Sequence, residues 1–248
     1  MFIEYKKSLH IIIRIALAML FLLTTSLGTS EATPKAKRAA TKTETARVVD
    51  QRPQTGQVID VSQWQGDIDW QKVNQQVDLA IIRTQYGSEA NEASYRLDTK
   101  KDEYYQAAKQ NKLPFASYAF SQFTSVEGAK QAADSFYAHA DKQSKFYVLD
   151  DEDHVGDASE QVYINAWLAR MRQLTKKKIV LYTYSSYLKE NQLDASQFDG
   201  TWIADYSANQ PQNSDLWQYT SQGHVDGING DVDISKTTSD QIYNWIKS

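Results

Sequence analysis

The feature that most constrains the fold of this chain is a regular alternation of two kinds of segment. From Gly56 onward, short apolar runs are separated by longer segments in which apolar residues recur at helical spacing. Near-continuous apolar runs that alternate with helices are typical of parallel strands buried on both faces. The runs expected to form strands are 57–60, 79–83, 114–120, 146–150 and 178–182. The helical spacing is clearest at 104–111, 129–136 and 162–174.

The C-terminal part of the chain breaks this alternation. Three apolar runs, 201–204, 215–219 and 232–234, follow one another with little room for helices between them. The pattern therefore predicts an α/β fold, an irregular TIM-like β/α barrel with about eight strands and fewer than eight helices. A doubly wound open sheet is the alternative, although no phosphate-binding glycine loop follows the first strand.

The N-terminal part has a different composition. A basic stretch precedes an apolar run over 15–23, and small and polar residues follow. This order predicts a secretory signal peptide or an N-terminal membrane anchor over residues 1–30. Residues 31–55 contain almost no large apolar side chains, so we expect a disordered linker there. Residues 56–248 would form the barrel of a secreted or cell-surface protein, which meets the membrane only through an uncleaved N-terminal segment.

Composition argues against several kinds of function. With 27 basic and 31 acidic residues the net charge is −4, so the chain lacks the basic footprint of a nucleic-acid-binding protein. It has no cysteine and four histidines, which disfavours a cysteine-based zinc site and a multi-histidine metal centre. We therefore expect no cofactor, no bound metal and no nucleic-acid partner, and we expect a monomer. The 15 tyrosines and 6 tryptophans are compatible with a protein that stacks aromatic rings on sugars.

Carboxylates gather where the predicted strands end. Asp60 ends the first strand, an acidic tetrad over 150–153 ends the fourth, and Asp233 lies in the last. In a parallel barrel the carboxyl ends of the strands form the active face. Because side chains two residues apart on a strand share a face, we expect Asp150 and Glu152 to point together and the intervening residue to point away.

Two carboxyl groups on one face are the minimum equipment for glycoside hydrolysis. One must hold a proton and give it to the leaving oxygen, while the other stays ionised and supports positive charge on the sugar. Crowding by like charge raises one pKa and so supplies the proton donor. A solvated acidic loop and a divalent-metal site built from the same carboxylates are the alternatives. The buried strand that delivers the tetrad favours the active site over the solvated loop.

Five motifs follow one another over roughly residues 57–247. They are Asp60-Val-Ser-Gln-Trp-Gln-Gly66 with Ile68-Asp-Trp70, Leu149-Asp-Asp-Glu152, Trp202-Ile-Ala-Asp-Tyr206, Trp217-Gln-Tyr219 and Gly227-Ile-Asn-Gly-Asp-Val-Asp233. Together they resemble glycoside hydrolase family 25, the Chalaropsis-type lysozymes. A lone Asp-x-Glu motif would be weak, but five motifs in the same order are specific. The resemblance implies an irregular β/α barrel that cleaves the bond between N-acetylmuramic acid and N-acetylglucosamine in peptidoglycan glycan chains.

The resemblance also implies roles for individual residues. Glu152 would be the proton donor, and Asp150 its partner, which either stabilises a reactive intermediate or positions the substrate's N-acetyl group. Asp60 and Asp233 match the other two acidic positions of the family's site. The candidates for sugar binding are Tyr118, Trp202, Tyr206, Asp205 and Trp217. The alternative functions are a non-catalytic cell-wall glycan-binding module and a metal-dependent hydrolase that uses the same carboxylates.

Overall fold

The computed structural model describes residues 55–88 and 95–248. The predicted signal segment over 1–30 lies outside these ranges, as does all but the last residue of the predicted linker over 31–55. Contacts within the chain group Asp50–Ser248 as one compact unit, to which every element described below belongs. Within the described ranges, no helix is long and apolar enough to cross a membrane.

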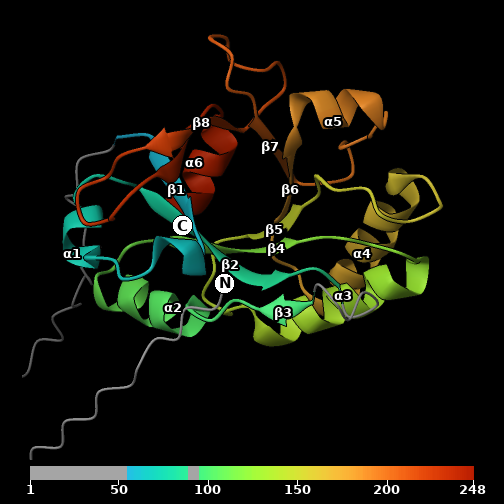
Figure 1. Cartoon of the computed structure of the whole chain (residues 1–248), viewed down its shortest axis with the longest axis horizontal. Coiled ribbons are helices and arrows are strands. Elements are labelled where there is room, and N and C mark those ends of the chain that lie inside the picture. Colours follow the sequence, from blue (N-terminus) through green and yellow to red (C-terminus); the bar gives the residue numbers. More distant parts are fainter. Residues whose placement is uncertain (1–54, 89–94) are drawn as a thin grey trace, which may run out of the picture. The chain divides into compact units, whose positions relative to one another are not determined.

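Eight strands close into a barrel (Figure 1). In order around it they are β1 (Gln57–Val61), β2 (Leu79–Tyr86), β4 (Phe115–Phe120), β5 (Tyr147–Asp150), β6 (Ile179–Tyr184), β7 (Gly200–Ala204), β8 (Leu216–Gly223) and β9 (Val232–Thr237). A short strand, β3 (Arg96–Leu97), pairs with the end of β2. Because β1 pairs with both β2 and β9, the sheet closes on itself, which confirms the predicted barrel and rejects the doubly wound open sheet.

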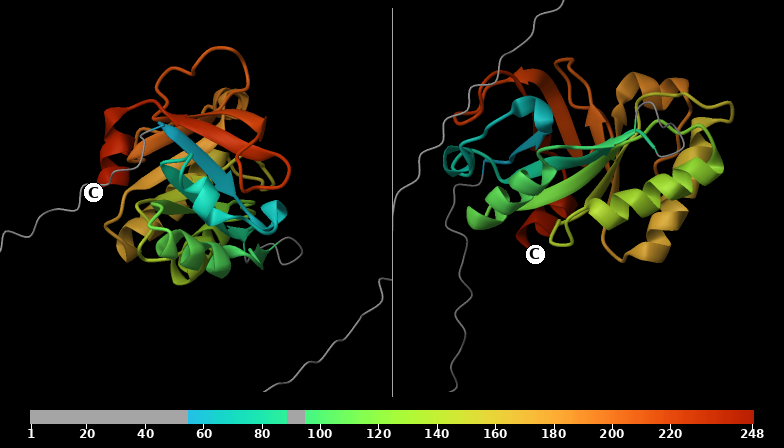
Figure 2. Two further views of the ribbon diagram at one scale, coloured as in Figure 1. Left: turned by 90° about the vertical axis from the view of Figure 1, so that its left-hand side faces the viewer. Right: turned by 60° about the horizontal axis from the view of Figure 1, so that its bottom comes forward.

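Helices accompany the first strands and are absent between the last ones. The described ranges contain η1 (Gln63–Gln65), α1 (Trp70–Val73), α2 (Lys101–Gln110), α3 (Val126–His139), α4 (Glu160–Leu174), α5 (Ser185–Glu190) and α6 (Asp240–Lys247). Figure 2 shows α3 and α4 side by side along the outside of the strands. No helix separates β7 from β8 or β8 from β9, as the sequence predicts. The strand β9 runs antiparallel to both of its neighbours, whereas the other barrel strands pair in parallel.

The apolar run of β2 shows why these strands are hydrophobic on both faces. Leu79 and Ile81 pack into the barrel interior, while Ala80 and Ile82 pack outward beneath the helices. All four are fully buried. Alternate side chains of a strand point to opposite faces, so a strand covered on both sides needs an unbroken apolar run.

The helix α6 closes one end of the barrel. Ser239 caps its N-terminus by accepting a hydrogen bond from the Ile242 amide. Ile242 and Ile246 join the interior cluster, and Trp245 meets Phe146, which precedes β5, edge to face at 6.0 Å. This end holds the starts of the parallel strands. The polar side chains inside the barrel therefore gather at the opposite end, where those strands finish.

Candidate active site

The strand ends bring carboxyl groups together at the end of the barrel opposite α6. Asp60 of β1 pairs across the antiparallel ladder with Asp233, the second residue of β9. Asp150 ends β5, between Phe120 of β4 and Tyr182 of β6. Because β9 runs opposite to its neighbours, its start lies beside the ends of the parallel strands. The reversal of β9 thus delivers Asp233 to the same place as Asp60 and Asp150.

These side chains open into a cavity of about 300 Å³, which we call the carboxyl cavity. It combines four acids with an arginine, seven aromatic rings and two further polar side chains. Its lining is Asp60, Arg83, Tyr86, Tyr118, Phe120, Asp150, Glu152, Tyr182, Tyr184, Trp202, Tyr206, Gln218, Ser221 and Asp233. All four predicted acids therefore lie at one site.

Aromatic rings form much of the wall of the carboxyl cavity. Tyr86 and Phe120 stack with their ring centroids 4.5 Å apart and their planes 11° from parallel. Tyr184 and Tyr206 meet edge to face at 6.2 Å, and Tyr206 is 48% exposed. Flat apolar faces beside hydrogen-bonding groups suit a ligand ring that is itself apolar on its faces and polar at its rim, as a sugar is.

Gln218 of β8 fixes the geometry around Asp60. Its Nε2 donates a hydrogen bond to Asp60 Oδ2 at 2.9 Å. Its Oε1 accepts hydrogen bonds from the hydroxyls of Tyr182 at 3.0 Å and Tyr206 at 2.9 Å. A carboxylate oxygen accepts and a hydroxyl can donate, so these partners set the orientation of the amide. Gln218 is buried, and its three hydrogen bonds hold Asp60, Tyr182 and Tyr206 in fixed positions relative to one another.

Arg83 brings a buried positive charge to the carboxyl cavity. Its Nε and Nη2 each lie 2.9 Å from Asp98 Oδ2. Asp98 also accepts a hydrogen bond from the Gln63 amide at 2.9 Å, and both members of the ion pair are buried. A buried charge is retained only where it is paired and hydrogen-bonded. Asp98 thus holds the guanidinium in place beside the cavity.

Burial raises the pKa of Glu152 to about 7. The negative charge of Asp233 adds to this rise, and a hydrogen bond with Tyr182 acts against it. Glu152 Oε2 is buried and has no hydrogen-bond partner among the described residues. A carboxyl group with this pKa still holds a proton near neutrality, so Glu152 can act as a general acid.

Burial also raises the pKa of Asp150, and the charges of Glu152 and Asp60 raise it further. The Arg83 guanidinium acts in the opposite direction and favours the Asp150 anion. Asp150 Oδ1 is buried and lacks a hydrogen-bond partner within 55–88 and 95–248. Carboxyl groups this close cannot all ionise independently, so the cluster takes up and releases protons as a unit.

Asp60 and Asp233 complete the cluster. Burial and the charge of Asp233 raise the pKa of Asp60, and the hydrogen bond from Gln218 acts against the rise. Burial raises the pKa of Asp233 to about 6. In the part of the chain that the structure describes, no three histidine or acidic side chains are arranged to hold a metal ion. The charge of Asp60 acts on Asp150, and the charge of Asp233 acts on Asp60 and Glu152.

Alternation along the chain separates the acids at the end of β5, as predicted. Asp150 and Glu152 line the carboxyl cavity. Asp151 is not part of that lining, and its Oδ1 accepts a hydrogen bond from Ser121 Oγ at 3.0 Å. The strand end thus places two acids in the cavity and directs the third into the layer outside the barrel.

The predicted sugar-binding residues divide into two groups. Tyr118, Trp202 and Tyr206 line the carboxyl cavity. Asp205 and Trp217 do not line it. Trp217 alternates with two inward-facing neighbours on β8, so it points outward, and its Nε1 donates to the backbone oxygen of Asp205 at 2.7 Å. Hydrogen bonds from Ser207 and Ser185 lower the pKa of the Asp205 carboxyl.

Sequence reasoning missed several polar residues of the cavity, among them Arg83, Tyr182 and Gln218. Each had a signal. Arg83 is a charge at the end of an otherwise apolar run, and Tyr182 ends the next predicted strand after Asp150. Gln218 lies two positions after Leu216 and so shares its inward face.

Comparisons with known proteins point to one family. Residues 59–228 match the glycosyl hydrolases family 25. The chain is 30% identical over 186 residues to the uncharacterized protein YegX of Escherichia coli K12, an alignment that covers 71% of this chain and 67% of YegX. It is 28% identical over 206 residues to lysozyme M1 of Streptomyces globisporus, covering 73% of this chain and 67% of that lysozyme. Its fold matches GHIP, a glycosyl hydrolase 25 of Streptococcus pneumoniae, with a TM-score of 0.68 and 26% identity over 77% of this chain and 89% of GHIP.

Proposed function

The chain belongs to glycosyl hydrolase family 25, and we propose that it is a lysozyme, an N-acetylmuramidase that hydrolyses peptidoglycan. The bond cleaved is the β-1,4 link between N-acetylmuramic acid and N-acetylglucosamine. Similarity to lysozyme M1 supports this substrate. The observation that carries the proposal is the carboxyl cavity, in which four acids face a single space walled by aromatic rings.

Glu152 is the proton donor in this mechanism. A pKa of about 7 keeps its proton available at neutral pH. Transfer of that proton to the glycosidic oxygen lets the leaving sugar depart as a neutral alcohol while positive charge develops on the sugar ring. The Glu152 side chain lines the carboxyl cavity, so its carboxyl group faces the space in which the glycosidic oxygen would bind.

Asp150 is the anionic partner. Arg83 favours its ionised form, and the Asp150 side chain lines the carboxyl cavity. The carboxylate either stabilises the positive sugar ring or holds the substrate's N-acetyl group in place to attack it. Asp60, held by Gln218, and Asp233 line the same cavity, and their ionised forms favour positive charge at this point.

Binding and location follow from the same substrate. Tyr118, Trp202 and Tyr206 are the residues that we assign to the sugar rings. Peptidoglycan lies outside the cytoplasmic membrane, and the basic and apolar sequence over residues 1–30 supports export. We therefore propose that the protein is secreted or surface-tethered, and we expect it to act as a monomer.

The experiment that tests this function is digestion of purified cell walls, with and without a chelator. A muramidase releases new reducing ends on N-acetylmuramic acid, and the chelator leaves the rate unchanged. Reducing ends on N-acetylglucosamine would contradict the bond assignment. Binding to walls without new reducing ends would establish the glycan-binding module, and loss of activity with chelator would establish the metal-dependent hydrolase.

A further inference from the structure

Two buried carboxyl groups touch one another directly behind the carboxyl cavity. Asp151 is fully buried in the step after β5, and Glu160, the first residue of α4, is 1% exposed. Their side chains are in hydrogen-bonding contact. The mechanism above uses neither of them, although Asp151 lies between Asp150 and Glu152 in the chain.

This contact requires a proton. Ionised carboxylates only accept hydrogen bonds, so two of them cannot bond to each other. Asp151 Oδ2 and Glu160 Oε1 are both buried and have no hydrogen-bond partner among the residues that the structure describes. Buried unpaired polar atoms are rare in folded proteins, and two adjacent buried anions repel strongly. One proton held between the groups removes one charge and supplies the missing donor.

The surroundings place the remaining negative charge on Glu160. It lies in the first turn of a 15-residue helix, whose N-terminus favours an anion. The Nδ1 atom of His154 is 2.5 Å from Glu160 Oε2 and donates to it. Burial and the charge of Glu160 raise the pKa of Asp151, which therefore keeps the proton. Burial raises the pKa of Glu160 to about 7, and its hydrogen bond with Asp151 acts against that rise.

The same contact joins the two ends of the loop over 151–159, which connects β5 to α4. Ser121 N and Oγ donate to the Asp150 backbone oxygen at 2.8 and 2.9 Å, and Ser121 Oγ also donates to Asp151. The Asp151 amide donates to the Tyr182 backbone oxygen at 3.0 Å. The residues on both sides of the strand end are thus anchored, and Glu152 follows directly.

We propose that Asp151 and Glu160 share one proton and are positioning residues for Glu152. Their contact ties the end of β5 to the first turn of α4, so that Glu152 stays aimed into the carboxyl cavity. The neutral Asp151 also spares Glu152 a further negative charge next to it. This inference rests on the proposed function, because it concerns the aim and charge of the proton donor.

Several titratable or polar groups face the pair from the elements packed against it. They are Ser121 after β4, His154 and Asp153 in the loop, Glu152 beside Asp151, and Tyr187 of α5. Asp153 is held by a hydrogen bond from Gln122 Nε2 at 2.6 Å. When Asp151 is ionised, its charge adds to those that raise the pKa of Glu152.

Two matched amide variants separate a shared proton from simple packing. Asp151→Asn and Glu160→Gln both keep the side-chain volume, and in both an amide can donate to the remaining carboxylate. The negative charge stays on Glu160 in the first and moves to Asp151, beside Glu152, in the second. Asp151→Ala removes the contact altogether. The measurement is kcat and KM for soluble peptidoglycan fragments as a function of pH.

We expect Glu160→Gln to move the high-pH limb of kcat upward by about half a pH unit or more, since a new neighbouring anion raises the pKa of the acid. Asp151→Asn should not move it upward. Asp151→Ala should lower kcat about tenfold or more with little change in KM, because a misaimed donor slows chemistry more than binding. Asp151→Asn should restore most of that loss. Identical pH profiles for the two amide variants, or an Asp151→Ala variant with unchanged kcat, would overturn the proposal.

A second measurement does not depend on activity. The pKa of Asp151 is raised in the folded protein, so its protonation stabilises the fold at low pH, and that contribution disappears as the pH rises through the folded pKa. In Asp151→Asn the free energy of unfolding should therefore decline less as the pH rises. If the wild-type enzyme fails to cleave walls, the proposed function fails, while this measurement still decides whether the pair shares a proton. An unchanged decline in Asp151→Asn would reject the shared proton.

Discussion

Two cavities of this protein hold carboxyl groups under opposite conditions. The carboxyl cavity, of about 300 Å³, contains buried acids whose pKa values are raised and whose free oxygens lack partners. A cavity of about 590 Å³ lies beside β7, between α5 and the stretch 211–215, and we call it the β7-side cavity. It is the larger of the two, and it too is lined by acids, among them Asp194, Asp199 and Asp215.

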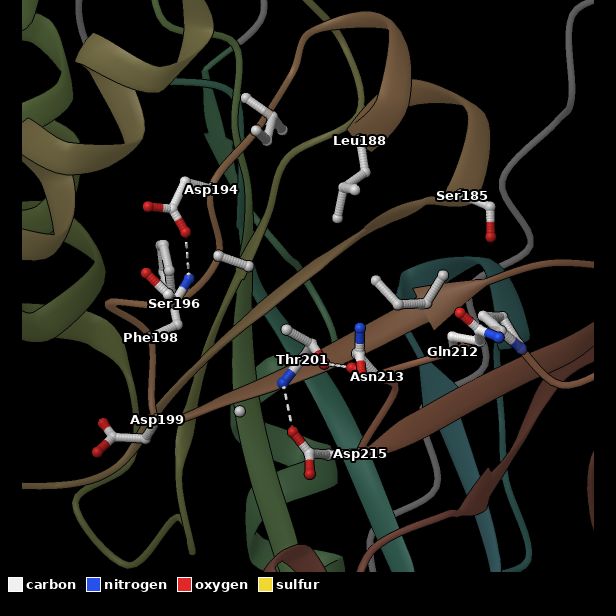
Figure 3. A pocket seen from close by; sticks show the side chains of 15 residues that line it. Ser185, Leu188, Asp194, Ser196, Phe198, Asp199, Thr201, Gln212, Asn213 and Asp215 are labelled. Atoms are coloured by element: carbon white, nitrogen blue, oxygen red, sulfur yellow. Dashed lines mark hydrogen bonds between the residues drawn. The ribbon is translucent and has the colours of Figure 1, made fainter.

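The acids of the β7-side cavity form hydrogen bonds and ion pairs within the folded protein. Figure 3 shows Asp215 accepting a hydrogen bond from the Thr201 amide, at 2.9 Å, and Asp194 accepting one from the Ser196 amide, also at 2.9 Å. Although burial opposes it, a hydrogen bond from the Ile179 amide of β6 and ion pairs with Lys178 and Arg172 lower the pKa of Asp199. These carboxylates already have the partners that a substrate or a proton would supply.

The difference shows which property identifies the active site. Cavity size does not identify the active site, because the larger cavity lies beside β7 and contains none of the four clustered acids. No helix connects β7 to β8 there. What distinguishes the smaller cavity is that its acids are crowded, largely buried and incompletely hydrogen-bonded. Such groups are costly to keep in a folded protein, and they cluster at functional sites.

The largest effect is expected for Glu152→Gln. The amide has nearly the same size, so the fold should survive, but it cannot donate the proton. Acid–base assistance is typically worth about 10²–10⁴-fold, and kcat on cell walls should fall by that factor. Retention of more than about a tenth of the wild-type rate would remove Glu152 from the acid role. Circular dichroism and thermal unfolding of the same preparation control for the fold.

Asp150→Asn should be impaired for a different reason. Loss of one preorganised electrostatic contact typically costs about 10²–10³-fold in kcat, and binding should change less because the charge matters most in the transition state. Removing a negative neighbour should also lower the pKa of Glu152 and move the high-pH limb of the rate profile downward. A pH series on wall substrate tests this. Near wild-type turnover throughout would defeat the paired-carboxylate mechanism, and the anomeric configuration of the wild-type product separates retention from inversion.

The two cavities should contribute to stability with opposite dependence on pH. The pKa of Glu152 is raised from 4.5 to about 7, so its contribution is present below pH 4.5 and lost as the pH rises through 7. The pKa of Asp199 is lowered, so its contribution is present above its unfolded value of 3.8 and lost as the pH falls. Urea unfolding across this range should show Glu152→Gln flattening the first slope and Asp199→Asn the second. The same sign for both would invalidate the contrast.

Asp199→Asn should lower the free energy of unfolding only slightly and leave catalysis intact. Its ion pairs with Arg172 and Lys178 are partly exposed, and such pairs are typically worth about 0.2–1 kcal/mol each. We expect a small decrease in the free energy of unfolding and a kcat within about twofold of wild type. This variant is the matched control for Glu152→Gln. A loss of activity as large as that of Glu152→Gln would mean that the β7-side cavity takes part in the reaction.

The smallest effect is expected for removal of the residues before Thr55. Residues 31–54 lack the apolar side chains needed to join a core, and residues 1–30 are the predicted signal peptide or anchor. The shortened protein should fold and cleave soluble glycan fragments at the wild-type rate. An insoluble or inactive product would show that the assignment of residues 31–55 to a linker is wrong.

Much of the fold could be predicted from the sequence because the strands have clear apolar patterns. A strand such as β2, buried on both faces, must be apolar throughout, and the absence of helices after β7 is visible as a shortage of intervening residues. The short α1 and α5 and the two-residue β3 were not predicted, since elements of this length carry too little periodicity. Tertiary packing decides whether such segments form.

Part of the candidate site could be predicted from the sequence for a similar reason. Acids at the ends of apolar runs predicted the cluster, but Gln218 and Arg83 are assigned only by the partners that the fold brings to them. Trp217 and Asp205 show that a sequence motif does not fix which side chains reach the cavity. They follow the pattern of a site motif, yet strand alternation and a local hydrogen bond place them outside the cavity. Neighbouring residues of one motif can therefore point to opposite faces of a strand.

The reversed strand β9 also sets when the enzyme can become active during synthesis. It supplies Asp233 and the pairing with β1 that closes the barrel, so the first and last strands must meet before the carboxyl cavity is complete. A nascent chain that has passed Glu152 but not β9 has its proton donor without an enclosed site to hold it. Pairings between distant parts of a chain also form late and slowly. A wall-degrading activity is thereby withheld from incomplete chains by topology alone.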